Sequence, residues 1–329
     1  MSSVPAGPAP RAVFFEHGGV RYRALWWGAS GGAVSAPPVV LLHGFSQSAH
    51  TWDEVVPLFA EMLPGRAIWA PEFVGHGGSD APRDPAPYAF GELVATLAGF
   101  IDEVVAPEPA LVAPRPAPET ISAPAGGGAT PSSERRLPRV ALVGYSMGGR
   151  VALAYAAGHS DRVAVLVLES AGLGPTDGAR RREATGRDAA LAARVRRDSL
   201  ADFMDFWETR PVFASQHALP QERRLLLREA RMHNDAEALA LTFEGSGQHA
   251  MPRLADAPAA LAERGVPVLY IAGELDPKYV SVARRLGEGA GGPRRGLSVH
   301  ILPDVGHDAH FEDPVRYARE VGTFLSGAC

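Results

Sequence analysis

Apolar and polar residues alternate along this chain in a pattern that predicts strands separated by helices. Several short runs are rich in Val, Leu and Ile, which is typical of buried parallel strands. The expected strands lie within 11–27 (a hairpin of two around His17-Gly18-Gly19), 39–42, 66–70, 140–143, 163–168, 266–272 and 297–302. Helical spacing is found at 51–60, 90–105, 311–325 and in the alanine-rich segment after Ser146. This order predicts a mostly parallel, doubly wound sheet covered by helices on both faces, an α/β architecture.

Two segments interrupt the alternation. Residues 106–138 are dominated by Pro, Gly, Ala and Ser, which predicts a disordered surface insertion. Residues 173–264 lack strand signals and show helical patterns rich in Arg, Ala and Leu, which predict a helical cap inserted after the sixth strand. We therefore expect a core formed by 11–172 and 265–329, with the cap lying over the edge of the sheet where ligands bind.

Composition and charge limit the partners and the cellular location that can be expected for this protein. The net charge of −5 over 329 residues gives no reason to expect a nucleic-acid partner. Lys278 is the only lysine and Cys329 the only cysteine, so no internal disulfide can form and a reducing compartment is expected. Residues 1–10 lack the pattern of a secretory signal, and no apolar run is long enough to span a membrane. A cytoplasmic location is expected, whereas the oligomeric state is left open.

The strand at 140–143 leads into Gly144-Tyr145-Ser146-Met147-Gly148, and a helix is expected to follow. A serine between two glycines at a strand-to-helix turn is the pattern of a nucleophile elbow. Glycines are needed there because the turn brings strand and helix close together. The pattern predicts that Ser146 is a nucleophile or base.

A serine hydroxyl needs a histidine to accept its proton and an acid to orient that histidine. Ser146, Asp276 and His307 each follow a predicted strand and occur in the order that the α/β-hydrolase fold requires. The competing histidines are His43 and His76, and the competing acids are Glu169 and Glu274.

The backbone N–H groups of Phe45 and Met147 are the expected oxyanion hole. No metal or cofactor is expected, because the sequence has no phosphate-binding glycine loop and no cluster of Cys or His with ligand spacing. His307 and His310 alone do not form a credible zinc pair.

With these motifs the chain resembles the MenH family, the 2-succinyl-6-hydroxy-2,4-cyclohexadiene-1-carboxylate synthases of menaquinone biosynthesis, within the α/β-hydrolase superfamily. The resemblance extends over nearly the whole chain except the N-terminal tail and 106–138. The matching stretches are His43-Gly44-Phe45-Ser46 with Trp52, Gly75-His76-Gly77-Gly78-Ser79, Gly144 to Val151, Trp207, Pro211-Val212-Phe213-Ala214-Ser215, Gly273 to Lys278 and Gly306 to His310.

The resemblance implies a lyase that eliminates pyruvate from an enolpyruvyl cyclohexene, with Ser146 acting as a base. The substrate carries three carboxylates, so arginines are expected in its pocket. Arg150 lies one helical turn beyond Ser146 and should face the same pocket. The resemblance implies a cap arginine at Arg231, and it leaves a third open between Arg182 and Arg187, because a gapless match places Ala184 there. Tyr145 and Trp207 are expected to line the pocket.

Two other functions remain compatible with the sequence. A serine hydrolase of carboxylic esters or of C–C bonds would use the same triad, since one fold supports many chemistries. A small-molecule receptor on this fold is the other alternative, although the triad is intact and the cap is charged.

Overall fold

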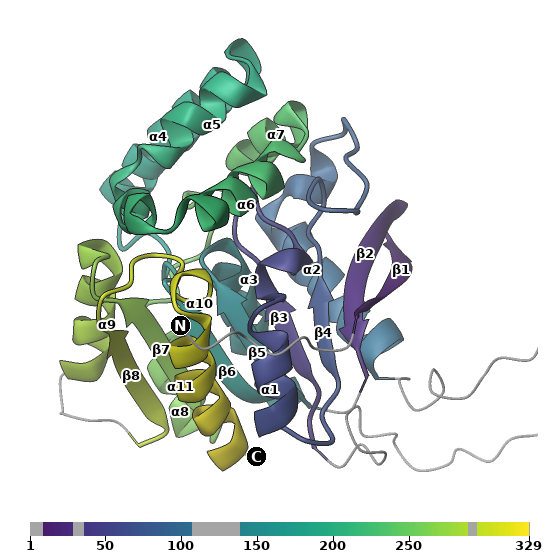
Figure 1. Ribbon diagram of the computed structural model, residues 1–329, viewed down its shortest axis with the longest axis vertical. Coiled ribbons are helices and arrows are strands. Elements are labelled where there is room, and N and C mark those ends of the chain that lie inside the picture. Colours follow the sequence, from purple (N-terminus) through teal and green to yellow (C-terminus); the bar gives the residue numbers. More distant parts are fainter. Residues whose placement is uncertain (1–8, 29–35, 107–138, 289–294, 329) are drawn as a thin grey trace, which may run out of the picture.

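Strands and helices alternate along the chain and build one sheet with helices on both faces (Figure 1). The computed structural model describes residues 9–28, 36–106, 139–288 and 295–328. The predicted insertion at 106–138 lies, apart from Ala106, outside the described residues. Among the described residues, no helix is both long and apolar enough to cross a membrane.

The described strands form one sheet of eight, in the order β1-β2-β4-β3-β5-β6-β7-β8. Their bounds are β1 Arg11–His17, β2 Val20–Trp27, β3 Val39–Leu42, β4 Ile68–Pro71, β5 Val140–Tyr145, β6 Val163–Glu169, β7 Val268–Gly273 and β8 Leu297–Leu302. The hairpin β1–β2 pairs antiparallel and joins the edge of β4 antiparallel, whereas every pairing from β4 to β8 is parallel. The predicted doubly wound sheet of the α/β-hydrolase fold is confirmed.

The central strands are buried on both faces, as their continuous apolar runs predict. Val39 and Leu41 pack on one face, against helices α1 and α11, and Val40 and Leu42 pack on the other face, against α2 and α3. The helices of the core are α1 Val56–Met62, α2 Phe90–Phe100 with its π-helical extension η3 Ile101–Val105, α3 Met147–Gly158, α8 Ala257–Glu263, α9 Pro277–Glu288, α10 Ala309–Glu312 and α11 Pro314–Gly327. Short 3-10 turns are η1 Ala49–Trp52, η2 Ala86–Tyr88 and η5 Ser160–Arg162.

Two of the predicted helices begin later than the hydrophobic spacing indicated. The helix expected at 51–60 is split into η1 and α1, with Pro57 in the first turn of α1, and Pro314 likewise opens α11. Proline favours the first helical turn because its missing N–H has no intrahelical acceptor there. Proline therefore sets both boundaries, which periodicity alone does not locate.

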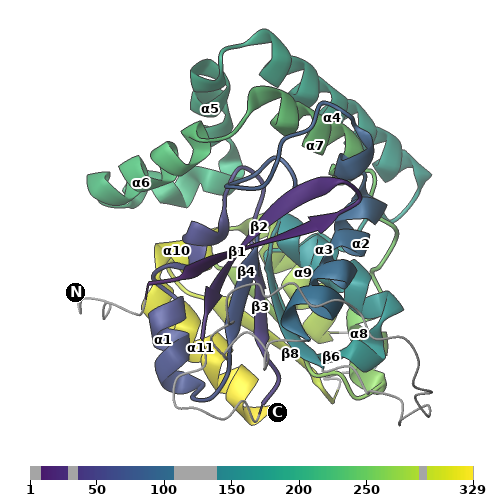
Figure 2. The ribbon, with the colours of Figure 1, turned by 90° about the vertical axis from the view of Figure 1, so that its right-hand side faces the viewer.

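The cap lies over the carboxyl ends of the strands, where Figures 1 and 2 show it as a separate helical layer. It consists of α4 Gly178–Arg197, α5 Leu200–Glu208, η6 Pro211–Ala218, α6 Gln221–Met232 and α7 Ala236–Ser246. Leu191, Phe203, Leu239 and Phe243 belong to its own apolar cluster. The expectation that the cap extends to 264 needs correction, because α8 packs on α3, β7 and β8 of the core.

Candidate active site

Ser146 occupies a strained turn between β5 and α3, with φ 49° and ψ −104°. A side chain at this φ costs on the order of 1–3 kcal/mol, so the surrounding structure must hold it in place. The glycines on either side permit the close packing: a methyl group at Gly144 would lie 2.6 Å from Gly149 Cα, and one at Gly148 would collide with the carbonyl of Leu42. The turn thus presents the serine at the carboxyl edge of the sheet.

Three loops at that edge bring the predicted triad together. His307 Nε2 lies 3.1 Å from Ser146 Oγ, and His307 Nδ1 lies 2.7 Å from Asp276 Oδ2. Asp276 and His307 are both buried, and Asp276 also accepts the backbone N–H of Tyr279. In this arrangement the Asp276 carboxylate favours the tautomer with a proton on Nδ1, which leaves Nε2 free to accept the serine proton.

The competing histidines have structural contacts elsewhere. His43 Nε2 accepts the Phe73 N–H at 3.1 Å, and its Nδ1 lies 2.8 Å from the carbonyl of Gly44. Burial lowers the pKa of His43, and burial together with the neighbouring His43 lowers the pKa of His76 to about 3. Both rings are therefore neutral, and His43 links the loop that contains Phe45 to the backbone of Phe73, whereas His76 contacts the carbonyl of Val74 at 2.9 Å.

The competing acids also lie away from His307. Glu274 is exposed, and Glu169 contacts His310 at 2.8 Å. Burial opposes protonation of His310, but the carboxylates of Glu169 and Asp308 outweigh it and raise the pKa of this histidine. Glu169, Asp308 and His310 offer ligand atoms close enough for a metal ion, but His310 Nδ1 already contacts the Glu169 carboxylate. His310 and Glu169 thus form a buried ion pair, and Asp308, whose pKa is raised by burial, lies 3.2 Å from the same ring nitrogen.

Phe45 and Met147 line the same pocket as Ser146. Among the described residues, neither of their backbone amides donates to a backbone carbonyl or to a side-chain acceptor. The Gly148 N–H, one residue further on, donates to the carbonyl of His43 and so joins the two loops at 3.1 Å. Both amides are therefore available for negative charge that develops next to Ser146.

The pocket above the triad encloses about 370 Å³ between the cap and the core. Its aromatic wall includes Phe45, Trp207, Phe213 and Phe243, and the ring centroids of Phe45 and Trp207 lie 5.2 Å apart. Tyr145 also lines the pocket, with its ring 5.3 Å from that of His307. Both aromatic residues expected at the pocket, Tyr145 and Trp207, thus line it.

Arg150 projects from α3 into this pocket, as its position one turn beyond Ser146 predicts. Its Nη1 donates to the carbonyl of Ser246 at 2.8 Å, and no carboxylate among the described residues lies within 4 Å of its guanidinium. Burial lowers the pKa of Arg150 relative to a free arginine. A buried guanidinium without a carboxylate partner is suited to bind an anionic group of a ligand.

The three cap arginines occupy different environments. Arg187 lines the pocket and pairs with Asp188 at 3.0 Å, whereas Arg182 is exposed and borders neither this pocket nor its neighbour. Arg231 is buried behind Phe213, whose ring it faces at 4.9 Å, and it pairs with Glu208 at 3.2 Å. Neither Arg182 nor Arg231 lines the pocket in this structure, so the expected contact of either with substrate stays a prediction.

Sequence reasoning did not nominate seven polar residues that line the pocket, which are Asp188, Arg210, Thr242, Ser246, Gln248, Lys278 and Tyr279. Lys278 and Tyr279 directly follow the Asp276-Pro277 pair, so a search of the residues beside the predicted triad acid would have found them. Arg210 and Gln248 have no such signal, because only the folding of the cap over the core brings them to the pocket.

Known proteins resemble this chain in sequence and in fold. The model of the alpha/beta hydrolase family matches residues 39–320. A Bacillus subtilis protein assigned as a 2-succinyl-6-hydroxy-2,4-cyclohexadiene-1-carboxylate synthase is 32% identical over 94% of this chain and 96% of its own. A Salmonella agona protein with the same synthase name is 29% identical over 86% of this chain and 91% of its own.

Two solved structures share the fold. The MenH structure from S. aureus has a TM-score of 0.72 and 24% identity, and the match covers 93% of this chain and 98% of that one. The enol-lactonase from Burkholderia xenovorans LB400 has a TM-score of 0.67 and 18% identity, with 95% and 100% covered.

Proposed function

We propose that this chain, which belongs to the MenH family of menaquinone biosynthesis within the α/β-hydrolase superfamily, eliminates pyruvate from 2-succinyl-5-enolpyruvyl-6-hydroxy-3-cyclohexene-1-carboxylate to give 2-succinyl-6-hydroxy-2,4-cyclohexadiene-1-carboxylate. The reaction is a carbon–oxygen bond cleavage without water. A cytoplasmic location, expected from the sequence, is part of the same proposal.

In the proposed mechanism Ser146 is a general base. As its oxygen takes a proton from the cyclohexene ring, His307 Nε2 takes the hydroxyl proton, and Asp276 stabilises the imidazolium that forms. The electron pair of the broken C–H bond moves through the ring and expels the enolpyruvyl oxygen. The released enolate recovers a proton, by way of Ser146 from His307, and becomes pyruvate, which restores the triad.

Negative charge that develops during proton removal would be held by the amides of Phe45 and Met147. Such donors are typically worth about 3–4 kcal/mol each when they are aimed at the developing charge. Both residues line the pocket of Ser146, and neither amide has an acceptor among the described residues, which supports this role.

The observation that carries the proposal is the combination of this triad with buried Arg150 in one pocket. An esterase acting on neutral esters has no need for a guanidinium there, and placing an unpaired charge in a buried site costs stability. A substrate with carboxylates supplies the missing partner, with Arg187 and Lys278 available for its other anionic groups.

The test is to mix purified protein with freshly generated enolpyruvyl precursor, and to follow released pyruvate and the absorbance of the diene. p-Nitrophenyl acetate is assayed in parallel. Pyruvate release with negligible ester cleavage supports the lyase. Ester cleavage without pyruvate overturns it in favour of a serine hydrolase, and binding of the precursor without either reaction would favour a receptor.

A further inference from the structure

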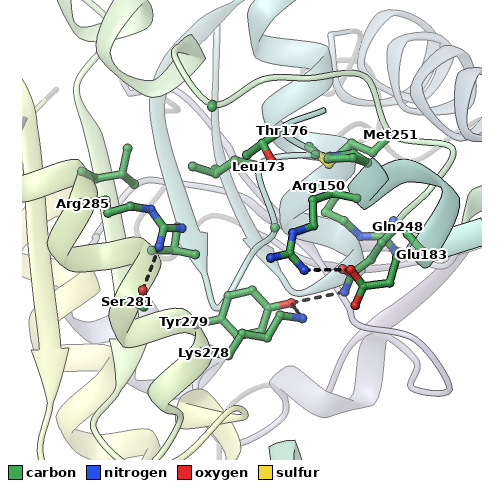
Figure 3. A pocket seen from close by; sticks show the side chains of 18 of the residues that line it. Arg150, Leu173, Thr176, Glu183, Gln248, Met251, Lys278, Tyr279, Ser281 and Arg285 are labelled. Atoms are coloured by element: carbon green, nitrogen blue, oxygen red, sulfur yellow. Dashed lines mark hydrogen bonds and ion pairs between the residues drawn. The ribbon is translucent and has the colours of Figure 1, made fainter. Parts of the chain in front are cut away.

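A second cavity of about 770 Å³ adjoins the catalytic pocket, and we call it the outer cavity. It lies between the first turns of α4 and the exposed face of α9. Its lining includes Arg150, Lys278 and Tyr279, which also line the catalytic pocket, together with Arg180 and Arg285, which do not. In Figure 3 the labelled Arg150 and Arg285 lie on either side of Tyr279. The two cavities therefore share a wall that contains cationic side chains.

The lining of the outer cavity is strongly cationic. Of the described residues, those that line it with a charge are Arg150, Arg180, Arg187, Lys278, Arg285 and a single acid, Glu183. The acid is already paired with Arg180 at 2.8 Å. The chain as a whole carries a net charge of −5, so this local excess does not follow from composition.

Within the part of the chain that the structure describes, three of these cations have neutral partners only. Arg150 donates to the carbonyl of Ser246, Lys278 to the hydroxyl of Tyr279 at 3.2 Å, and Arg285 to the hydroxyl of Ser281 at 2.7 Å. Several cap arginines outside the cavity are instead paired with carboxylates, as in the pairs of Arg196 with Glu237, of Arg228 with Asp205 and of Arg231 with Glu208, although Arg181 donates to the carbonyl of His249. Positive charge is thus left uncompensated along one path, from the surface at Arg285 to the pocket at Arg150.

The remaining lining is largely apolar and includes Leu173, Met251, Val282 and Leu286. Ligand cavities of this size and mixture commonly hold small organic molecules, with a few polar groups fixing their orientation. A ligand that fits both features has an apolar carbon skeleton and several carboxylates.

We propose that the outer cavity captures the polycarboxylate substrate before it reaches Ser146, with Arg285 as the outermost cation of the path. That the captured ligand is the substrate rests on the proposed function, whereas carboxylate binding at this site does not. A cleft lined by one sign of charge raises the local concentration of oppositely charged ligands and speeds their entry, and salt weakens both effects.

The experiment compares Arg285→Glu with Arg284→Glu. Arg284 is the preceding residue on α9 and is also exposed, but it lines neither cavity, so the two variants have the same net charge. Binding of citrate, an unreactive tricarboxylate, is measured by titration calorimetry at low and at high salt. Arg285→Lys, which keeps the charge, serves as the conservative variant, and melting temperatures verify that all three variants are folded.

We expect Arg285→Glu to weaken citrate binding about fivefold or more at low salt, Arg284→Glu by less than about twofold, and both differences to shrink at high salt. Arg285→Lys should bind nearly as the unaltered chain does. Equal weakening by the two glutamate variants, or no citrate binding to the unaltered chain, overturns the proposal.

A parallel assay of pyruvate release separates this inference from the proposed function. Capture of the substrate predicts a lower kcat/KM in Arg285→Glu at low salt with an unchanged kcat. A chain that binds citrate through Arg285 but releases no pyruvate would refute the lyase and retain the carboxylate site.

Discussion

Glu312 Oε2 accepts the backbone N–H of Gly306 at 2.7 Å, one residue before His307. The other oxygen of the same carboxylate accepts the hydroxyl of Ser215, in η6 of the cap, at 2.9 Å. Glu312 therefore joins the loop of the triad histidine to the cap that closes the pocket. Neither contact touches a reacting atom, so we infer a positioning role for this glutamate.

Two replacements of Glu312 should show whether activity depends on its hydrogen bonds or on its negative charge. Glutamine can still accept from Gly306 and can donate to Ser215 Oγ, so we expect E312Q to keep most of the activity. Alanine leaves the Gly306 N–H without an acceptor and loosens the loop of His307, and we expect kcat to fall about tenfold. Turnover and KM for both variants check this, and equal activity in all three proteins would contradict the positioning role.

The stability of the protein should depend on the ionisation of Glu312. Burial raises the pKa of Glu312 from its ordinary value of 4.5 to about 7 in the folded protein, against the opposing effect of the Gly306 hydrogen bond. Because the folded state then binds the proton more tightly than the unfolded state, stability from this group is greatest below the unfolded pKa and falls as pH rises towards the folded value. The loss should be on the order of 3 kcal/mol between about pH 4.5 and pH 7.

E312Q tests this pH dependence directly, because the amide does not titrate. Urea unfolding of both proteins, at about pH 5 and at about pH 8, should show a stability difference that shifts in favour of the variant at the higher pH. A difference that is independent of pH would mean that Glu312 does not titrate in this range.

Ser146 should be needed for turnover and dispensable for folding. S146A removes the hydroxyl that His307 Nε2 contacts, and we expect turnover to fall at least about a thousandfold while the melting temperature changes little. S146G also relieves the positive φ of 49° and should raise the free energy of unfolding by about 1 kcal/mol relative to S146A. Unchanged turnover in S146A would remove this serine from the mechanism.

Loss of the Arg150 charge should lower activity on anionic substrates and leave activity on neutral esters nearly unchanged. R150M keeps an unbranched side chain in the buried site but removes the charge, so we expect kcat/KM for the tricarboxylate substrate to fall on the order of a hundredfold. Cleavage of p-nitrophenyl acetate, where it is detectable, should change little, since that ester has no carboxylate to bind. Equal losses on both substrates would contradict a role in carboxylate binding.

The triad geometry was predictable because each member follows a strand of a parallel sheet, and the carboxyl ends of such strands meet at one edge. Ser146 and its glycines are adjacent in the sequence, so local sterics identify them. Asp276 and His307 required the order of strands as well, and the observed β7 and β8 supply it.

The cap was less predictable because helical periodicity does not fix how helices pack. Arg182 and Arg187 lie on one helix, five residues and therefore about 140° apart, so they cannot both face the pocket. The sequence alone does not show which of the two arginines faces the pocket. The pairing of Arg231 with Glu208 likewise depends on how α5 packs against α6.

Gly148, in the first turn of helix α3, tests how closely this turn must approach the loop that contains His43 and Phe45. A methyl group at Gly148 would collide with the carbonyl of Leu42 and lie 2.7 Å from that of His43, both of them backbone atoms that cannot turn aside. G148A should therefore destabilise the fold by more than about 3 kcal/mol or displace the loop of Phe45 and abolish activity.

Gly158, at the other end of α3, is the matched control because a methyl group there meets nothing within 4 Å. G158A should stabilise the protein by about 0.5–1 kcal/mol through the lower entropy of its unfolded chain. Urea unfolding of both variants separates helix propensity, which favours alanine at either position, from the close approach at Gly148. If G148A were as stable and as active as G158A, the amides of Phe45 and Met147 would not depend on this contact, and the oxyanion hole would need another source of rigidity.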